Sequence, residues 1–259
     1  MTVLDDYLKN IIRKYTPSDC SMENLMHDKS KLSKSISNWA DKNGFVLNEI
    51  KISGSTAKGT AITLGSDLDI FVSVTDNYVI KSLNDMYCSL ADYLERIYKN
   101  VRKQNVSIRV IINDHKIDIV PAKLHSYIQN GNHSLYLNKK KTWMKTNIQK
   151  QINIIKNSGK TDEIKLIKIW RDLHNLEFPS IYLEMSIIEA LKHKMCYGIF
   201  DTFRNLLTYF RDDFLNITIY DPANSNNILS DLITDTEKQD IKNCAKKSLN
   251  ESNLINIVW

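Results

Sequence analysis

Two aspartates in an apolar strand constrain this chain more than any other feature. Residues 67–74 read Asp-Leu-Asp-Ile-Phe-Val-Ser-Val, a run that predicts a β-strand. Side chains two residues apart in a strand point to the same face, so Asp67 and Asp69 emerge together. Leu68 and Ile70 then enter the core on the opposite face. Carboxylates on such a strand are costly to bury unless a positive charge accompanies them, so the strand predicts an α/β sheet with an acidic site on one face.

A third aspartate lies in a second strand of the same kind. In residues 116–120 two isoleucines point one way and Asp118 points the other. Three carboxylates on neighbouring strands repel one another, and a divalent metal resolves that repulsion. Mg²⁺ prefers hard oxygen ligands, typically a few carboxylates together with phosphate oxygens of a substrate. We therefore expect Asp67, Asp69 and Asp118 to hold two Mg²⁺ ions, with Mn²⁺ as a substitute.

An isolated Asp-x-Asp pair lies more often on a solvated strand face than in a metal site. The segment before the aspartate strand favours the metal site. Residues 54–60 read Gly-Ser-Thr-Ala-Lys-Gly-Thr and follow another predicted strand. Gly54 allows the backbone to approach a phosphate closely, and Ser55 supplies a hydroxyl. The following residues can begin a short helix whose N–H groups face an anion, with Lys58 and Thr60 assisting.

In their order and spacing, these segments resemble the DNA-polymerase-β-like nucleotidyltransferases. The matching segments are Gly-Ser-Thr-Ala-Lys-Gly-Thr at 54–60, Gly-Ser-Asp-Leu-Asp-Ile-Phe-Val at 65–72 and Ile-Asp-Ile-Val-Pro-Ala at 117–122. They look like the branch that contains 2′-5′ oligoadenylate synthases, archaeal CCA-adding enzymes and bacterial cyclic-oligonucleotide synthases (CD-NTases). The resemblance implies a palm-like α/β lobe, the three aspartates as catalytic metal ligands, and Gly54 and Ser55 as contacts to the donor triphosphate.

Two residues further along resemble the phosphate contacts of that branch. In those enzymes a helix lysine and a serine that opens the next helix hold the β- and γ-phosphates of the donor, and Lys168 and Ser180 match them. Without the resemblance, Lys168 is a solvated lysine and Ser180 an N-cap. Some relatives place a base-stacking aromatic directly after the serine. Here Ile181 holds that position and Tyr182 follows it, which leaves the base preference open.

Hydrophobic periodicity predicts an α/β lobe at residues 1–141 and a helical lobe at residues 142–259, with the active site in the cleft between them. This is the α/β plus α class, a polymerase-β-like palm lobe followed by a helical lobe. The predicted strands cover residues 46–53, 67–74, 106–112 and 116–120, and the predicted helices cover residues 3–15, 23–43, 78–100, 145–158, 162–175, 180–194, 197–210 and 235–249. Residues 221–227 are expected to form a turn stabilised by Asx hydrogen bonds.

Composition limits the classes of protein to which the chain can belong. With 42% hydrophobic and 25% charged residues, it reads as a soluble globular protein. Its four cysteines lie far apart, as expected of reduced thiols. Without a long apolar stretch or a basic leader, we expect a cytoplasmic protein that does not contact membranes. A net charge of +5 fits polyphosphate binding and weak nucleic-acid contact, and equally an ordinary lysine-rich surface.

The leading functional hypothesis is metal-dependent nucleotidyl transfer from nucleoside triphosphates, with release of pyrophosphate. Its product is expected to be a cyclic-oligonucleotide second messenger of antiphage defence, read by a downstream effector. The alternative is a template-independent RNA nucleotidyltransferase of the CCA-adding type with an RNA acceptor, against which the charge excess is small. A third hypothesis is a non-catalytic nucleotide-binding or antitoxin-like protein, against which the three aspartates and the Gly-Ser pair are all present.

Overall fold

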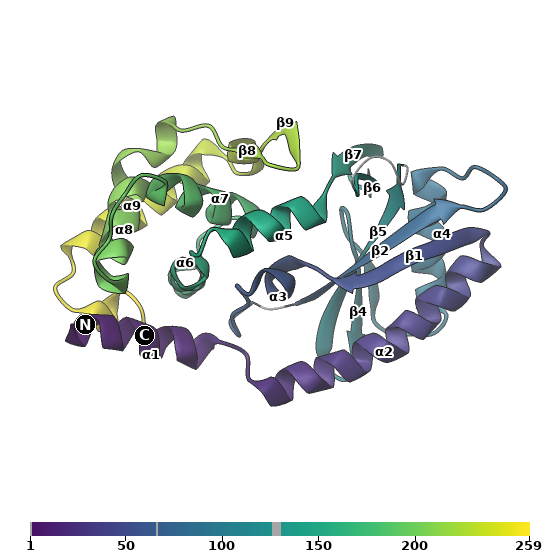
Figure 1. Cartoon of the computed structure of the whole chain (residues 1–259), viewed down its shortest axis with the longest axis horizontal. Coiled ribbons are helices and arrows are strands. Elements are labelled where there is room, and N and C mark those ends of the chain that lie inside the picture. The colour runs from purple at the N-terminus through teal and green to yellow at the C-terminus, as the bar shows by residue number, and fades with distance from the viewer. Residues whose placement is uncertain (1, 66, 126–130) are drawn as a thin grey trace. The chain divides into compact units, whose positions relative to one another are not determined.

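The computed structural model describes residues 2–65, 67–125 and 131–259, without the side chains of residues 20–22 (Figure 1). The chain divides into two compact units, each built from segments that are separate in the sequence. Unit 1 comprises Met1–Pro17, Gly59–Ser66 and Asn153–Trp259, and unit 2 comprises Ser18–Lys58 and Asp67–Ile152. This division differs from the predicted lobes at 1–141 and 142–259, because the N-terminal helix and residues 59–66 pack with the helical unit.

Unit 2 contains a mixed sheet, which confirms the predicted α/β class. Within the described residues the sheet has seven strands: β1 (Phe45–Ile52), β2 (Leu68–Asp76), β3 (Val101–Lys103), β4 (Ile108–Ile112), β5 (His115–Leu124), β6 (His133–Leu137) and β7 (Thr142–Thr146). The main order is β1-β2-β5-β4-β3, and β6 pairs with β5 and β7. Strands β2 and β5 run parallel, whereas the other neighbours are antiparallel.

The alternation along β2 separates the two faces of this sheet. Ile70 and Val72 belong to a buried core with residues of α2 (Asp19–Lys42) and α4 (Leu83–Glu95), which cover one face. Asp69 therefore points to the opposite face. The predicted helix at 78–100 is shorter in the structure because Ser82 and Asp85 form a capping box that begins α4.

Unit 1 is mainly helical. Its helices are α1 (Val3–Tyr15), α6 (Thr161–Leu173), α7 (Ser180–Leu191), α8 (Ile199–Asp212) and α9 (Asp235–Asn250), with 3₁₀ helices at Phe214–Asn216, Leu229–Leu232 and Leu254–Asn256. Helix α5 (Ile148–Asn157) contains the boundary between the two units. The helix predicted at residues 3–15 is confirmed as α1, and its Leu8, Ile11 and Ile12 join the same buried cluster as Trp170. Burial of each such aliphatic side chain contributes about 1.5–3 kcal/mol.

Two short segments complete the description. Strands β8 (Tyr220–Asp221) and β9 (Asn224–Ile228) form a hairpin, and the Ala223 N–H donates to Asp221 Oδ1 at 2.8 Å, which confirms the predicted Asx turn. At the C-terminal end, Tyr7 Oη donates to the Val258 carbonyl at 2.7 Å. None of the helices in the described ranges combines the length and apolar character that a bilayer crossing requires.

Candidate active site at three aspartates

The register of the central strands brings the predicted aspartates together. Asp69 and Asp118 are Cα partners across the parallel pair β2–β5, so both side chains leave the same face of the sheet. Asp67 stands directly before the first residue of β2 and is partly exposed, whereas Asp118 is buried. The alternation in the sequence thus predicted correctly which side chains would share a face.

Gly54 fixes the position of one of these carboxylates. It is the first residue of the short helix α3 (Gly54–Lys58), with φ +57°, a left-handed conformation that glycine adopts readily. A β-carbon at this position would lie 1.7 Å from Oδ2 of Asp69. Beside it, the Ser53 N–H donates to the Asp69 carbonyl at 2.8 Å. The close approach seen at Gly54 is therefore to the Asp69 carboxylate, and its predicted approach to a phosphate stays a prediction.

An arginine that the sequence reasoning missed lies among the aspartates. Arg109 is the Cα partner of Asp118 across β4 and β5, and its guanidinium forms a bidentate pair with that carboxylate. Nε lies 2.8 Å from Asp118 Oδ1, and Nη2 lies 2.9 Å from Asp118 Oδ2. Nη2 also donates to Asp67 Oδ2. Strand alternation could have indicated this position, because Arg109 stands between the core residues Ile108 and Val110. Its side chain must therefore leave the face of the sheet opposite to theirs.

The pKa shifts of Asp67 and Arg109 indicate that the aspartate site favours a bound positive charge. Burial raises the pKa of Asp67, and the nearby Asp118 adds to the increase, while Arg109 opposes it. The hydrogen bond to Asp118 raises the pKa of Arg109. Within the described residues no group of three or more His, Cys, Asp or Glu is arranged to hold a metal ion. The donor chemistry nevertheless fits a hard divalent cation, since a positive group already lies against two of three converging carboxylates.

The residues predicted beside Gly54 have different surroundings. Ser55 lies half-buried in the first turn of α3, and Lys58 at the end of the helix is buried. The assisting role predicted for Lys58 stays a prediction. Ser55 stays a prediction.

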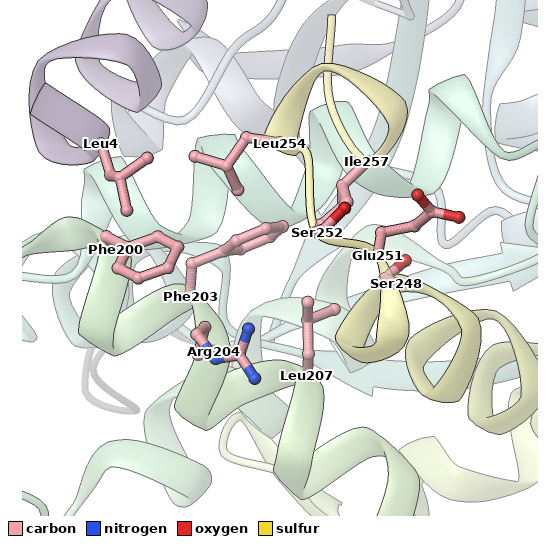
Figure 2. Close-up of a pocket in the computed structure, with 10 residues that line it drawn as sticks. All are labelled: Leu4, Phe200, Phe203, Arg204, Leu207, Ser248, Glu251, Ser252, Leu254 and Ile257. Atoms are coloured by element: carbon pink, nitrogen blue, oxygen red, sulfur yellow. The ribbon is translucent and has the colours of Figure 1, made fainter.

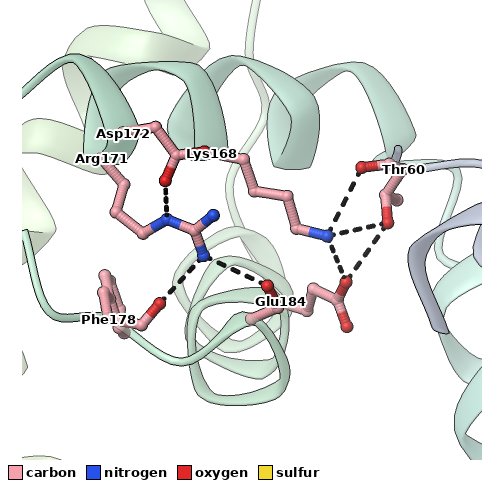
Figure 3. Close-up of polar contacts among 7 residues, drawn as sticks. Thr60, Lys168, Arg171, Asp172, Phe178 and Glu184 are labelled. Atoms are coloured by element: carbon pink, nitrogen blue, oxygen red, sulfur yellow. Dashed lines mark hydrogen bonds and ion pairs between the residues drawn. The ribbon is translucent and has the colours of Figure 1, made fainter. Parts of the chain in front are cut away.

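Lys168 and Thr60 form a buried polar cluster with Glu184 (Figure 3). Lys168, with 2% of its side chain exposed, places Nζ 2.7 Å from Glu184 Oε1 and 3.0 Å from Thr60 Oγ1. In this structure Lys168 and Thr60 therefore lie in an ion-pair cluster, and their predicted triphosphate contacts stay a prediction. Helix α6 is buried continuously from Leu166 to Trp170, so it has no solvated face at Lys168.

Tyr182 is likewise a core residue. Its ring stacks on Phe214 with centroids 5.3 Å apart and meets the edge of Phe178 at 5.2 Å. Burial raises the pKa of its hydroxyl to about 12. The ring is fully enclosed by protein in this structure, and nucleotide binding at Tyr182 stays a prediction.

Ser180 is exposed and is the first residue of α7, although the capping position is Pro179 and carries no side-chain cap. Its hydroxyl accepts a hydrogen bond from Nη1 of Arg171 at 3.1 Å, and the same nitrogen donates to the Phe178 carbonyl at 3.0 Å (Figure 3). Nε of Arg171 lies 2.6 Å from Asp172 Oδ1. Sequence reasoning missed Arg171, which lies one helical turn beyond Lys168.

A separate pocket lies in unit 1 (Figure 2). Its walls combine apolar residues of α1, α8 and the C-terminal segment with Arg204 and Glu251. It encloses about 60 Å³, whereas pockets for small organic ligands usually hold several hundred. None of the predicted site residues lines it, and it is too small to receive a nucleoside triphosphate.

Comparison with known proteins places these residues in a family context. Residues 1–158 match the family model described as the Second Messenger Oligonucleotide or Dinucleotide Synthetase domain. Over 169 residues the chain is 26% identical to a Cyclic AMP-AMP-AMP synthase of Escherichia coli strain MS 115-1. The aligned residues cover 60% of this chain and 52% of that protein. The chain thus spans about half the length of this curated relative.

Solved structures show the same fold at low sequence identity. The Escherichia coli MS115-1 CdnC structure with ATP superposes with a TM-score of 0.78 at 19% identity, over 95% of this chain and 90% of that chain. The CD-NTase CdnG of Bradyrhizobium diazoefficiens in complex with GTP gives a TM-score of 0.70 at 12% identity, over 95% and 91% of the two chains. The predicted polymerase-β-like nucleotidyltransferase fold is therefore confirmed.

Proposed function

Because this chain belongs to the Second Messenger Oligonucleotide or Dinucleotide Synthetase family, we propose that it joins nucleoside triphosphates into a cyclic oligonucleotide and releases pyrophosphate. The observation that carries the proposal is the register of Asp69 and Asp118 on the parallel strands β2 and β5. Together with Asp67 they form a three-carboxylate site on one face of the sheet. Such carboxylates could hold the pair of metal ions that stabilises the attacking and leaving oxygens in a displacement at phosphorus.

The aspartates are proposed to hold Mg²⁺, two ions in all, with Mn²⁺ as a substitute. When bound, the metal lowers the barrier for attack by a hydroxyl and stabilises the leaving pyrophosphate. The protein's own part is to hold the carboxylates in place, and Gly54 does this for Asp69 by leaving room for its Oδ2. The Ser55 hydroxyl is proposed to contact the phosphates of the donor.

The second phosphate contact is proposed at Ser180 and Arg171. Ser180 is exposed and its hydroxyl already meets a guanidinium, whereas the ammonium of Lys168 is engaged by Glu184. Arginine binds phosphate through a planar fork of donors, so Arg171 is proposed to add positive charge at Ser180, in addition to the phosphate contact proposed for Lys168.

The product and the nucleotides named for related proteins indicate which substrate to test first. One relative is named for a product built from AMP, and solved structures of others contain ATP or GTP, so ATP is the first substrate to test. A role in antiphage defence, a downstream effector and a cytoplasmic location are parts of the same proposal. The RNA nucleotidyltransferase remains the alternative.

The test is incubation of the purified protein with ATP, or with all four triphosphates, in Mg²⁺ or Mn²⁺, with and without RNA. A closed ring has no terminal phosphate, so mass spectrometry of the phosphatase-treated small-molecule fraction should show a surviving product. Label found only on added RNA would establish the alternative. If neither product forms and no metal-dependent binding of triphosphate is detected, the chain is a non-catalytic protein and the proposal fails.

A further inference from the structure

Arg109 is the positive group that the structure places against the aspartate site. Its guanidinium uses Nε and Nη2 to reach both oxygens of Asp118 and one oxygen of Asp67. The three side chains are shielded from most of the solvent, with 25%, 12% and 27% of Arg109, Asp118 and Asp67 exposed. Ion pairs with this degree of shielding are weakened by water much less than pairs on an open surface.

The same oxygens cannot serve two cations equally well. A metal ion bound by Asp67 and Asp118 would take lone pairs that now accept hydrogen bonds from Arg109. It would also bring its charge to within a few ångströms of the guanidinium, where like charges repel strongly. The guanidinium cannot relieve this repulsion by losing a proton, because arginine stays charged in proteins. Metal binding and the present pairing of Arg109 therefore compete.

We propose that Arg109 is the internal counter-cation of the aspartate site, and that it leaves Asp67 and Asp118 when a divalent cation binds. In the cation-free protein it holds the two carboxylates together against their mutual repulsion. It also raises the concentration of divalent cation at which the site fills. The inference rests on the proposed function, since it takes these aspartates as the metal ligands.

The chain offers a matched control for this arginine. Arg102 on β3 is the Cα partner of Arg109 across the antiparallel pair β3–β4, so it lies one strand further from Asp118. It is exposed, unlike Arg109. Arg102→Gln removes the same charge by the same chemical change from the neighbouring strand.

The first experiment measures Mn²⁺ affinity of the full nucleotide-free chain by titration, with free Mn²⁺ followed by electron paramagnetic resonance. Arg109→Gln is expected to bind Mn²⁺ about tenfold more tightly than the wild type, or tighter still, because a competing unit charge has been removed. Arg102→Gln is expected to bind like the wild type. An Arg109→Gln affinity equal to or weaker than wild type overturns the role of Arg109 while leaving the metal site in place. If no variant binds Mn²⁺ even with ATP present, the metal site fails and this inference fails with it.

A second measurement uses the wild-type chain and so does not depend on the folding of a variant. The Nε–H resonance of Arg109 is followed by ¹⁵N nuclear magnetic resonance and assigned by its loss in Arg109→Lys. Saturating Mg²⁺ is expected to shift this resonance, because the hydrogen bond to Asp118 breaks. A resonance that stays unchanged while the site fills with Mg²⁺ shows that Arg109 remains paired, and it overturns the proposal.

Discussion

Oδ2 of Asp69 lies only 1.7 Å from the point where a β-carbon on Gly54 would stand. We therefore predict that Gly54→Ala displaces the Asp69 carboxylate, lowers the free energy of unfolding by more than about 1 kcal/mol and removes most nucleotidyl-transfer activity. Gly59→Ala is the control, since Gly59 also has a positive φ (+76°) but nothing within 4 Å of its added β-carbon. Urea unfolding and product formation measure both effects. Wild-type activity in Gly54→Ala would show that Gly54 does not set the position of Asp69.

The double substitution Asp67→Asn with Asp69→Asn is predicted to abolish turnover without loss of the fold. Burial raises the pKa of Asp67, so the folded chain disfavours its charged form, and a neutral amide removes that cost at neutral pH. Arg109 keeps its two hydrogen bonds to Asp118 in this variant. Thermal unfolding should show a melting temperature at or above that of the wild type. Retained synthesis of product would remove these aspartates from the proposed mechanism.

Lys168→Ala is predicted to destabilise the fold, which reverses the expectation that it mainly weakens triphosphate binding. The substitution leaves Glu184, a fully buried carboxylate, without its ammonium partner, and breaking such a pair costs about 3–5 kcal/mol. Lys168→Met combined with Glu184→Gln should recover much of that loss. The neighbouring half-buried Lys165→Ala is the control and should change the free energy of unfolding by less than about 0.5 kcal/mol. A stable Lys168→Ala variant with a raised KM for triphosphate would restore the original assignment.

Asp5 is predicted to make the stability of unit 1 depend on pH in the acidic range. Its carboxylate accepts hydrogen bonds from the N–H groups of Thr2 at 2.9 Å and Phe200 at 3.0 Å, and these bonds lower its pKa to about 2. The stabilisation is therefore complete above the ordinary value of 3.8 and is lost as the pH falls through about 2. The difference in melting temperature between wild type and Asp5→Asn should be constant above about pH 4 and shrink below it. Asp6→Asn, which alters the adjacent exposed carboxylate, should show no comparable difference.

The parts of the site that were predictable from sequence depend on local alternation. The period of two in residues 67–74 placed Asp67 with Asp69, and the same period in residues 116–120 set Asp118 opposite its isoleucines. The register of β2 and β5 then pairs Asp69 with Asp118. The same alternation also gives the face of the sheet to which Arg109 points. Its contact with Asp118, however, depends on the register between β4 and β5, which local patterns do not encode. A strand's own sequence shows which way a side chain points and not what lies opposite it.

The parts that were not predictable depend on contacts between distant segments. Helical periodicity correctly placed Lys168 on α6, but it did not show that Thr60 and Glu184 cover that position, 108 and 16 residues away. The burial of Tyr182 was missed for the same reason, since Phe214, from beyond α8, packs against its ring. Short strands such as β3 and β6 were missed because three to five residues carry too little pattern.

The segmented make-up of unit 1 has a consequence for synthesis on the ribosome. Every residue of unit 2 has been translated once Ile152 is added, so that unit can fold while the chain is still growing. Helix α1 emerges earlier still. Its residues share a buried cluster with Trp170, and its Tyr7 donates a hydrogen bond to the Val258 carbonyl, but both of these partners are translated much later. Its apolar face, including Leu8 and Ile11, must stay without its native partners until then. Helix α1 is therefore translated long before it can reach its place, and a nascent-chain chaperone has long access to it.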